Sequence, residues 1–150
     1  MARPVIAVIG SASPSQTGYE LARQVGFLLA KAGALILCGG LGGVMEAACL
    51  GAAEAGGLSI GLLPGTDPAA ANPYLTIALA TGLGHARNAL IARAAWSLVA
   101  IEGGYGTIAE AALGLKMGKR VIGLAAAFDL PGLVRAETAE EAVRLALAKS

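Results

Sequence analysis

The sequence predicts an α/β protein built on a doubly wound, open parallel sheet of about six or seven strands, in a Rossmann-like arrangement of three αβα layers. Short apolar runs, as long as buried strands, alternate with segments in which apolar residues recur at helical spacing. Clusters of glycine, serine and proline separate the two kinds of segment. Regular alternation of strand and helix favours a parallel sheet covered on both faces by right-handed crossovers.

Each element of the first half follows from a local pattern. Apolar runs bounded by turn residues predict strands at residues 4–9, 34–37 and 58–63. Helical spacing predicts helices at residues 19–31 and 44–55. Gly33 stops the first of these helices, and two glycines follow the second. A connection rich in proline and alanine then leads into the second half.

The second half continues the alternation. Strands are predicted at residues 75–79, 97–101 and 120–124, and residues 133–136 can add an edge strand. Helices are predicted at residues 85–95 and 107–117 and after Thr138. Thr138 and Glu141 stand in capping-box register, which marks the start of the last helix.

Composition limits the classes of function. The 150 residues predict a single domain, and the charged share of 14% is well below the usual share of roughly 25%. Because polar groups are too few to cover a monomer, we expect a homo-oligomer, a dimer or a tetramer. The eleven Lys and Arg residues are scattered, so a nucleic acid partner is not expected. With no apolar stretch of roughly 20 residues and no signal peptide, we expect a cytoplasmic location without a membrane partner.

Three loops carry the predicted binding site. They begin at Gly10, Gly39 and Gly103 and leave the carboxyl edge of the sheet, where open α/β sheets bind ligands. The last loop joins a strand to a helix, so free N–H groups and the helix dipole favour an anion there. The predicted ligand-binding residues are Gly10, Ser11, Gly39, Gly40, Gly42, Gly43, Gly103, Gly104, Tyr105, Gly106 and Thr107. Further candidates are Ser13, Met45, Glu46 and Asn88.

Other cofactor chemistries are disfavoured. Neither glycine loop has the dinucleotide fingerprint, and the Walker pattern with Gly-Lys-Ser/Thr is absent, so NAD, FAD and P-loop nucleotide hydrolysis are not expected. Cys38 and Cys49 have neither metal-ligand spacing nor a predicted Cys or His neighbour. We therefore interpret them as reduced packing residues and predict no metal site. His85, the only histidine, is interpreted as a turn or interface residue.

Two family resemblances follow from these motifs. The run Gly-Gly-Tyr-Gly-Thr from Gly103, with Glu110 after it and Arg87 before it, resembles the motif of the LONELY GUY family of nucleoside 5′-monophosphate phosphoribohydrolases. Residues 71–74 and 81–88 look closer to the molybdenum cofactor carrier-like proteins. The resemblance implies a Rossmann-like fold, no required cofactor, and a nucleotide or the molybdenum cofactor as the ligand. It also implies a catalytic pair, Arg87 and Glu110, if the protein is a hydrolase.

Two departures from the hydrolase pattern bear on activity. Glu102 stands where that pattern has proline, and Asn88 stands where it has lysine. A carboxylate pointing into the anion site weakens phosphate binding, and loss of the lysine removes a positive charge. Thr107 can cap the following helix or donate to a phosphate oxygen, and Glu110 can stabilise an oxocarbenium-like transition state.

Three functions stay open at this point. The sequence favours binding of a phosphorylated nucleotide-like or pterin ligand, with hydrolysis of nucleoside monophosphates as the alternative. A structural or interaction protein with empty glycine loops is the third. The lysine decarboxylase label that accompanies such sequences is rejected, because the four lysines lie on or near helices away from the three loops, where none can form a Schiff base.

Overall fold

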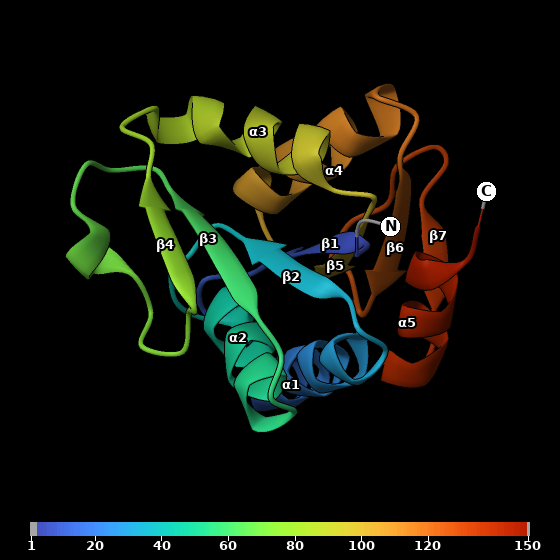
Figure 1. Cartoon of the computed structure of the whole chain (residues 1–150). Helices are drawn as coiled ribbons and strands as arrows, with labels where there is room; N and C mark the ends of the chain where they lie inside the picture. The colour runs from blue at the N-terminus through green and yellow to red at the C-terminus, as the bar shows by residue number, and fades with distance from the viewer. Residues whose placement is uncertain (1–2, 150) are drawn as a thin grey trace.

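Seven parallel strands form the sheet of the computed structural model, which describes residues 3–149 (Figure 1). The strands are β1 (Val5–Gly10), β2 (Leu35–Cys38), β3 (Ser59–Leu63), β4 (Ile77–Ala80), β5 (Ser97–Ile101), β6 (Arg120–Leu124) and β7 (Val134–Ala136). Their spatial order is β4-β3-β2-β1-β5-β6-β7. Each neighbouring pair is parallel, which confirms the predicted open α/β sheet.

Helices cover both faces of this sheet (Figure 1). They are α1 (Gln16–Lys31), α2 (Val44–Glu54), α3 (Arg87–Ala94), α4 (Tyr105–Lys116) and α5 (Ala139–Leu147), with 3-10 turns η1 (Pro68–Ala70) and η2 (Gly84–Ala86). One apolar core lies under α1, α2 and α5. A second core, which includes Ile91 and Ala111, lies under α3 and α4. All five residues of β5 are buried because the strand is covered on both faces.

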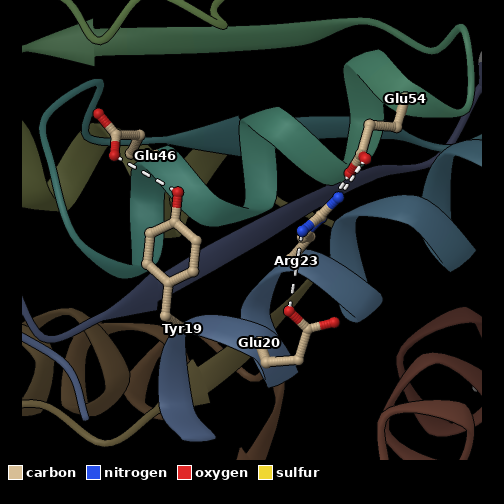
Figure 2. A network of polar contacts seen from close by, with 5 residues as sticks. All are labelled: Tyr19, Glu20, Arg23, Glu46 and Glu54. Carbon is tan, nitrogen blue, oxygen red and sulfur yellow. Dashed lines mark hydrogen bonds and ion pairs between the residues drawn. The ribbon is translucent and has the colours of Figure 1, made fainter. Parts of the chain in front are cut away.

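The backbones of helices α1 and α2 are in close contact. A Cβ atom on Gly26 would lie 2.0 Å from the carbonyl oxygen of Ala48, and one on Gly51 would lie 1.9 Å from that of Arg23. Only glycine fits at these two positions. At the surface, the Arg23 guanidinium donates two hydrogen bonds to the Glu54 carboxylate across the same pair of helices (Figure 2).

Several element boundaries differ from the sequence prediction. Helix α1 begins three residues early, at Gln16, because the Ser15 hydroxyl accepts a hydrogen bond from the Gly18 N–H and caps it. The segment predicted as one helix at residues 85–95 is divided into η2 and α3. The last helix begins as predicted, with the Thr138 hydroxyl accepting from the Glu141 N–H. The Glu141 carboxylate, however, accepts from the N–H of Glu137 instead of that of Thr138.

The strand order creates a switch point between β1 and β5. From β1 the chain winds outward through β2 and β3 to β4, and from β5 it winds the other way through β6 to β7. Gly10 is paired with Ile101, so the carboxyl ends of β1 and β5 lie side by side. Their loops diverge toward opposite faces, which opens a crevice at this edge.

None of the helices within residues 3–149 combines the length and the apolar character that spanning a membrane requires.

Candidate functional site

A cleft of about 530 Å³ lies at the carboxyl ends of β1 and β5. Three segments form it: the loop after β1, the start of α2 with the loop before it, and the start of α4; η2 and α3 add further residues. Ten of the predicted site residues line the cleft: Gly10, Ser11, Ser13, Met45, Arg87, Asn88, Gly104, Gly106, Thr107 and Glu110. The lining also includes Ala12, Leu41 and His85, which the sequence analysis did not assign to the site.

Seven predicted residues lie outside this lining: Gly39, Gly40, Gly42, Gly43, Gly103, Tyr105 and Glu46. Packing accounts for several of them. Gly40 has a φ of +80°, and its N–H donates to the Cys38 sulfur. The Glu46 carboxylate accepts a hydrogen bond from the Tyr19 hydroxyl at 3.5 Å, between α1 and α2 (Figure 2). Tyr105 is 92% exposed.

Gly43 fixes the loop after β1 against the start of α2. Its φ is +70°, and a Cβ atom there would lie 2.3 Å from the carbonyl oxygen of Ser11. That carbonyl accepts a hydrogen bond from the Val44 N–H at 2.9 Å. The first N–H of α2 therefore holds the loop that contains Ser11. Position 43 requires glycine, because a side chain there would clash with this loop.

The start of α4 is the open anion-binding element of the cleft. The N-cap is Gly104, and no side chain caps the helix. The Ile108 N–H makes the first helical hydrogen bond, to the carbonyl of Gly104, so the N–H groups of residues 105–107 have no helical acceptor. These groups and the helix dipole favour an anion.

Thr107 is not the helix cap, contrary to one of the roles predicted for it. It lies in the first turn of α4 and is 4% exposed. No hydrogen bond joins its hydroxyl to another described residue. Gly103, at a φ of +103°, packs against it, because a Cβ atom there would lie 2.5 Å from the Thr107 Cβ. The Thr107 side chain is thus held at the cleft wall.

Arg87 is fixed by the backbone at the start of α3. One amino group donates to the carbonyl oxygens of Gly39 at 2.7 Å and Leu62 at 2.5 Å, and Nε donates to the Asn88 side chain at 3.0 Å. A Cβ atom on Gly39 would lie 2.5 Å from that amino group, so Gly39 makes room for the guanidinium. Burial lowers the pKa of Arg87, but the group stays charged.

Glu110 shares the cleft with Arg87. Burial raises the pKa of the Glu110 carboxyl to about 7, while the positive charge of Arg87 acts in the opposite direction. Burial outweighs attraction, and the two groups form no ion pair within 4.0 Å. The cleft therefore holds a fixed cation and a carboxyl group that exchanges its proton near neutral pH.

The Glu102 carboxylate does not point toward the open start of α4. An inward-pointing carboxylate there would have weakened phosphate binding. Its carboxylate accepts hydrogen bonds from the N–H of Ser15 at 2.9 Å and from the hydroxyl of the same residue at 2.5 Å. The charge at this departure from the hydrolase pattern is directed to the start of α1 instead.

The prediction that the cysteines have no cysteine neighbour is wrong. The two buried sulfur atoms of Cys38 and Cys49 are 3.6 Å apart, because β2 and α2 pack together in three dimensions. Both are free thiols. Among residues 3–149 no group of three or more His, Cys, Asp or Glu side chains is arranged to hold a metal ion. No lysine lines the cleft.

The raised pKa of Glu110 makes stability depend on pH. Between a pH of about 4.5 and about 7 the folded protein keeps a proton that the unfolded chain releases, so the free energy of unfolding falls as pH rises through this range. The total loss is about 3 kcal/mol. We expect Glu110→Gln to remove this fall, as measured by urea denaturation from pH 4.5 to 8. Glu20→Gln, on the outer side of α1, is the control, and parallel curves for Glu110→Gln and the wild type would contradict the assignment.

Known proteins resemble this chain over nearly its whole length. The SLOG cluster4 family matches residues 3–150. An uncharacterised protein of Archaeoglobus fulgidus is 42% identical over 145 residues, which cover 97% of this chain and 95% of that protein.

Solved structures give the same relation. The molybdenum cofactor binding protein from Rippkaea orientalis is 35% identical, with a TM-score of 0.91, over 97% of this chain and 96% of that one. The molybdenum cofactor carrier protein from Chlamydomonas reinhardtii is 33% identical, with a TM-score of 0.83, over 96% of each chain. DNA processing protein A from Streptococcus pneumoniae, at 18% identity, shares the fold alone. The predicted relation to the molybdenum cofactor carrier-like proteins is confirmed, and the chain belongs to the SLOG cluster4 family.

Proposed function

We propose that this protein binds a phosphorylated small molecule of the nucleotide or pterin type in the cleft between β1 and β5. The observation that carries the proposal is the uncapped start of α4, which lines the cleft beside Arg87. A phosphate group placed there would accept hydrogen bonds from the free N–H groups and from the Thr107 hydroxyl. The similar proteins from Rippkaea orientalis and Chlamydomonas reinhardtii are a molybdenum cofactor binding protein and a molybdenum cofactor carrier protein, and this supports a pterin ligand.

The rest of the cleft suits a flat heteroaromatic ring. Leu41, Met45 and Ala12 supply apolar surface in its lining. Asn88 is 8% exposed, and because its oxygen accepts from Arg87, its amide N–H groups are free to donate. His85 adds a further polar group. A mostly apolar pocket with a few placed polar groups is typical of cofactor and nucleotide sites. The residues present therefore fit a pterin or a purine, with the phosphate at α4.

Binding is tested with purified protein in a thermal-shift screen against AMP, GMP, CMP, IMP and a molybdopterin source, followed by calorimetry of each hit. We expect Thr107→Val to weaken phosphomonoester binding about tenfold, since it removes one hydrogen bond to a charged group at nearly constant volume. Thr17→Val, on the exposed face of α1, should bind like the wild type. If no phosphorylated ligand stabilises the protein, the proposed binding function is contradicted and a structural or interaction role is favoured.

Hydrolysis of a nucleoside 5′-monophosphate is the second candidate, and the pKa of Glu110 favours it. A carboxyl group that titrates at about 7 can serve as a general acid or base at neutral pH. As a carboxylate it can also stabilise positive charge on the ribose when the bond to the base breaks. Arg87 would then orient the phosphate or the leaving base.

Release of free base from AMP distinguishes the enzyme from the binding protein. If the Glu110 carboxylate acts, the rate should rise with pH through about 7, because the ionised form becomes dominant above the pKa. Glu110→Gln should then abolish release of base while AMP binding persists. Binding of AMP without released base at any pH from 6 to 9 would exclude this candidate for AMP.

We also propose that the protein assembles as a homo-oligomer in the cytoplasm. Large apolar side chains are exposed at the edge of the sheet, on Ile77 and Leu79 of β4, and Leu83 before η2 and Leu90 of α3 are exposed as well. Such side chains at an edge strand favour association. Light scattering of the purified chain at micromolar concentration should give the mass of a dimer or a tetramer, and a mass near 14.8 kDa would contradict this proposal.

A further inference from the structure

Glu102 adopts a backbone conformation that is unusual for a residue other than glycine. It follows β5 directly and has a φ of +53°, in the left-handed region that favours glycine. Its N–H donates to the carbonyl of Ala125 at 3.2 Å, and its own carbonyl accepts from the Ala127 N–H at 3.4 Å. The residue is therefore held in a conformation that costs about 1 kcal/mol or more, next to the cleft.

The strained backbone places the carboxylate at the N-cap of α1. Both oxygen atoms accept hydrogen bonds from Ser15, one from its N–H and one from its hydroxyl, and the Ser15 hydroxyl in turn accepts from the Gly18 N–H. A Cβ atom on Gly18 would lie 2.4 Å from a carboxylate oxygen of Glu102. Ser15 and Gly18 at the start of α1 thus lie close around the carboxylate of Glu102, which comes from the loop after β5.

This carboxylate stands where an external anion would bind. In open α/β sheets the helix that follows the first strand presents its N-terminus to a phosphate group of the ligand. Here β1 and β5 are neighbours, and Ser11 and Ser13 of the loop before α1 line the same cleft as α4. Glu102 is two residues before Gly104, the N-cap of α4, and it hydrogen-bonds to Ser15, the N-cap of α1, so this residue connects the two helix starts.

We propose that Glu102 is a specificity-determining residue that fills the anion position at the start of α1 and limits the cleft to ligands with one phosphate group. The inference rests on the proposed binding function. The start of α4 receives that phosphate, and a second phosphate directed at the loop after β1 meets the negative charge of Glu102. None of the ion pairs among the described residues includes Glu102, and its carboxylate accepts hydrogen bonds from Ser15 at the start of α1.

Calorimetric titration of the full chain with AMP and ADP tests this inference. The wild type should bind AMP more tightly than ADP. Glu102→Gln keeps an oxygen that accepts from Ser15 but removes the charge, so the ratio of the ADP to the AMP dissociation constant should fall at least tenfold. Glu20→Gln, which removes one negative charge from the first half of α1 without touching Ser15, should leave the ratio unchanged. An unchanged ratio in a folded Glu102→Gln protein overturns the proposal.

A second measurement separates this inference from the proposed function. If neither nucleotide binds the wild type, the proposed function fails for these ligands, and inorganic pyrophosphate then serves as the probe. In Glu102→Gln, pyrophosphate should shift the amide NMR signal of Gly18, whereas the wild-type signal should not move. Absence of a shift in the variant overturns the inference. Should Glu102→Gln fold poorly, Glu102→Gly removes the carboxylate and relieves the left-handed strain, with the same expected results.

Discussion

The pairing of β1 with β5 is the constraint on which the candidate site depends. These strands begin the two halves of the sheet, and Gly10 lies beside Ile101 at their carboxyl ends. A Cβ atom on Gly10 would lie 2.3 Å from the Ile101 carbonyl oxygen, so the approach requires glycine there. Because the two loops leave toward opposite faces of the sheet, the strand order alone produces a cleft at this point. The proposed ligand-binding and hydrolytic roles follow from the residues that line this cleft.

Two carboxylates and one guanidinium determine the charge around the cleft. Glu102 is turned away to Ser15, whereas Glu110 lies in the cleft, where burial raises its pKa to about 7. Arg87 is held by carbonyl oxygens from two neighbouring segments, so its position does not depend on a ligand. A fixed guanidinium loses little side-chain freedom when a ligand binds, and this favours recognition of an anion. The guanidinium of the proposed anion site is therefore in place without a ligand.

The glycines divide into two groups that look alike in the sequence. Gly104 and Gly106 leave open space at the start of α4, where a ligand can approach the backbone. Gly39 instead makes room for Arg87, and Gly43 for the loop carbonyl of Ser11. A glycine-rich loop predicts close approach but does not tell whether a ligand or the protein itself approaches. For this reason only some of the glycines predicted for the site line the cleft, although the loops that carry them end at the same edge of the sheet.

The sequence by itself determined the alternation of strand and helix, the parallel sheet and the edge at which the loops gather. These features follow from local hydrophobic periodicity and turn residues, which need no knowledge of distant contacts. Only the tertiary structure decided the direction of the Glu102 carboxylate, the contact of Cys38 with Cys49 and the place of His85 in the cleft. Such contacts join residues far apart in the chain or depend on backbone angles that composition and spacing do not specify. Packing and hydrogen bonding across the sheet edge fix them.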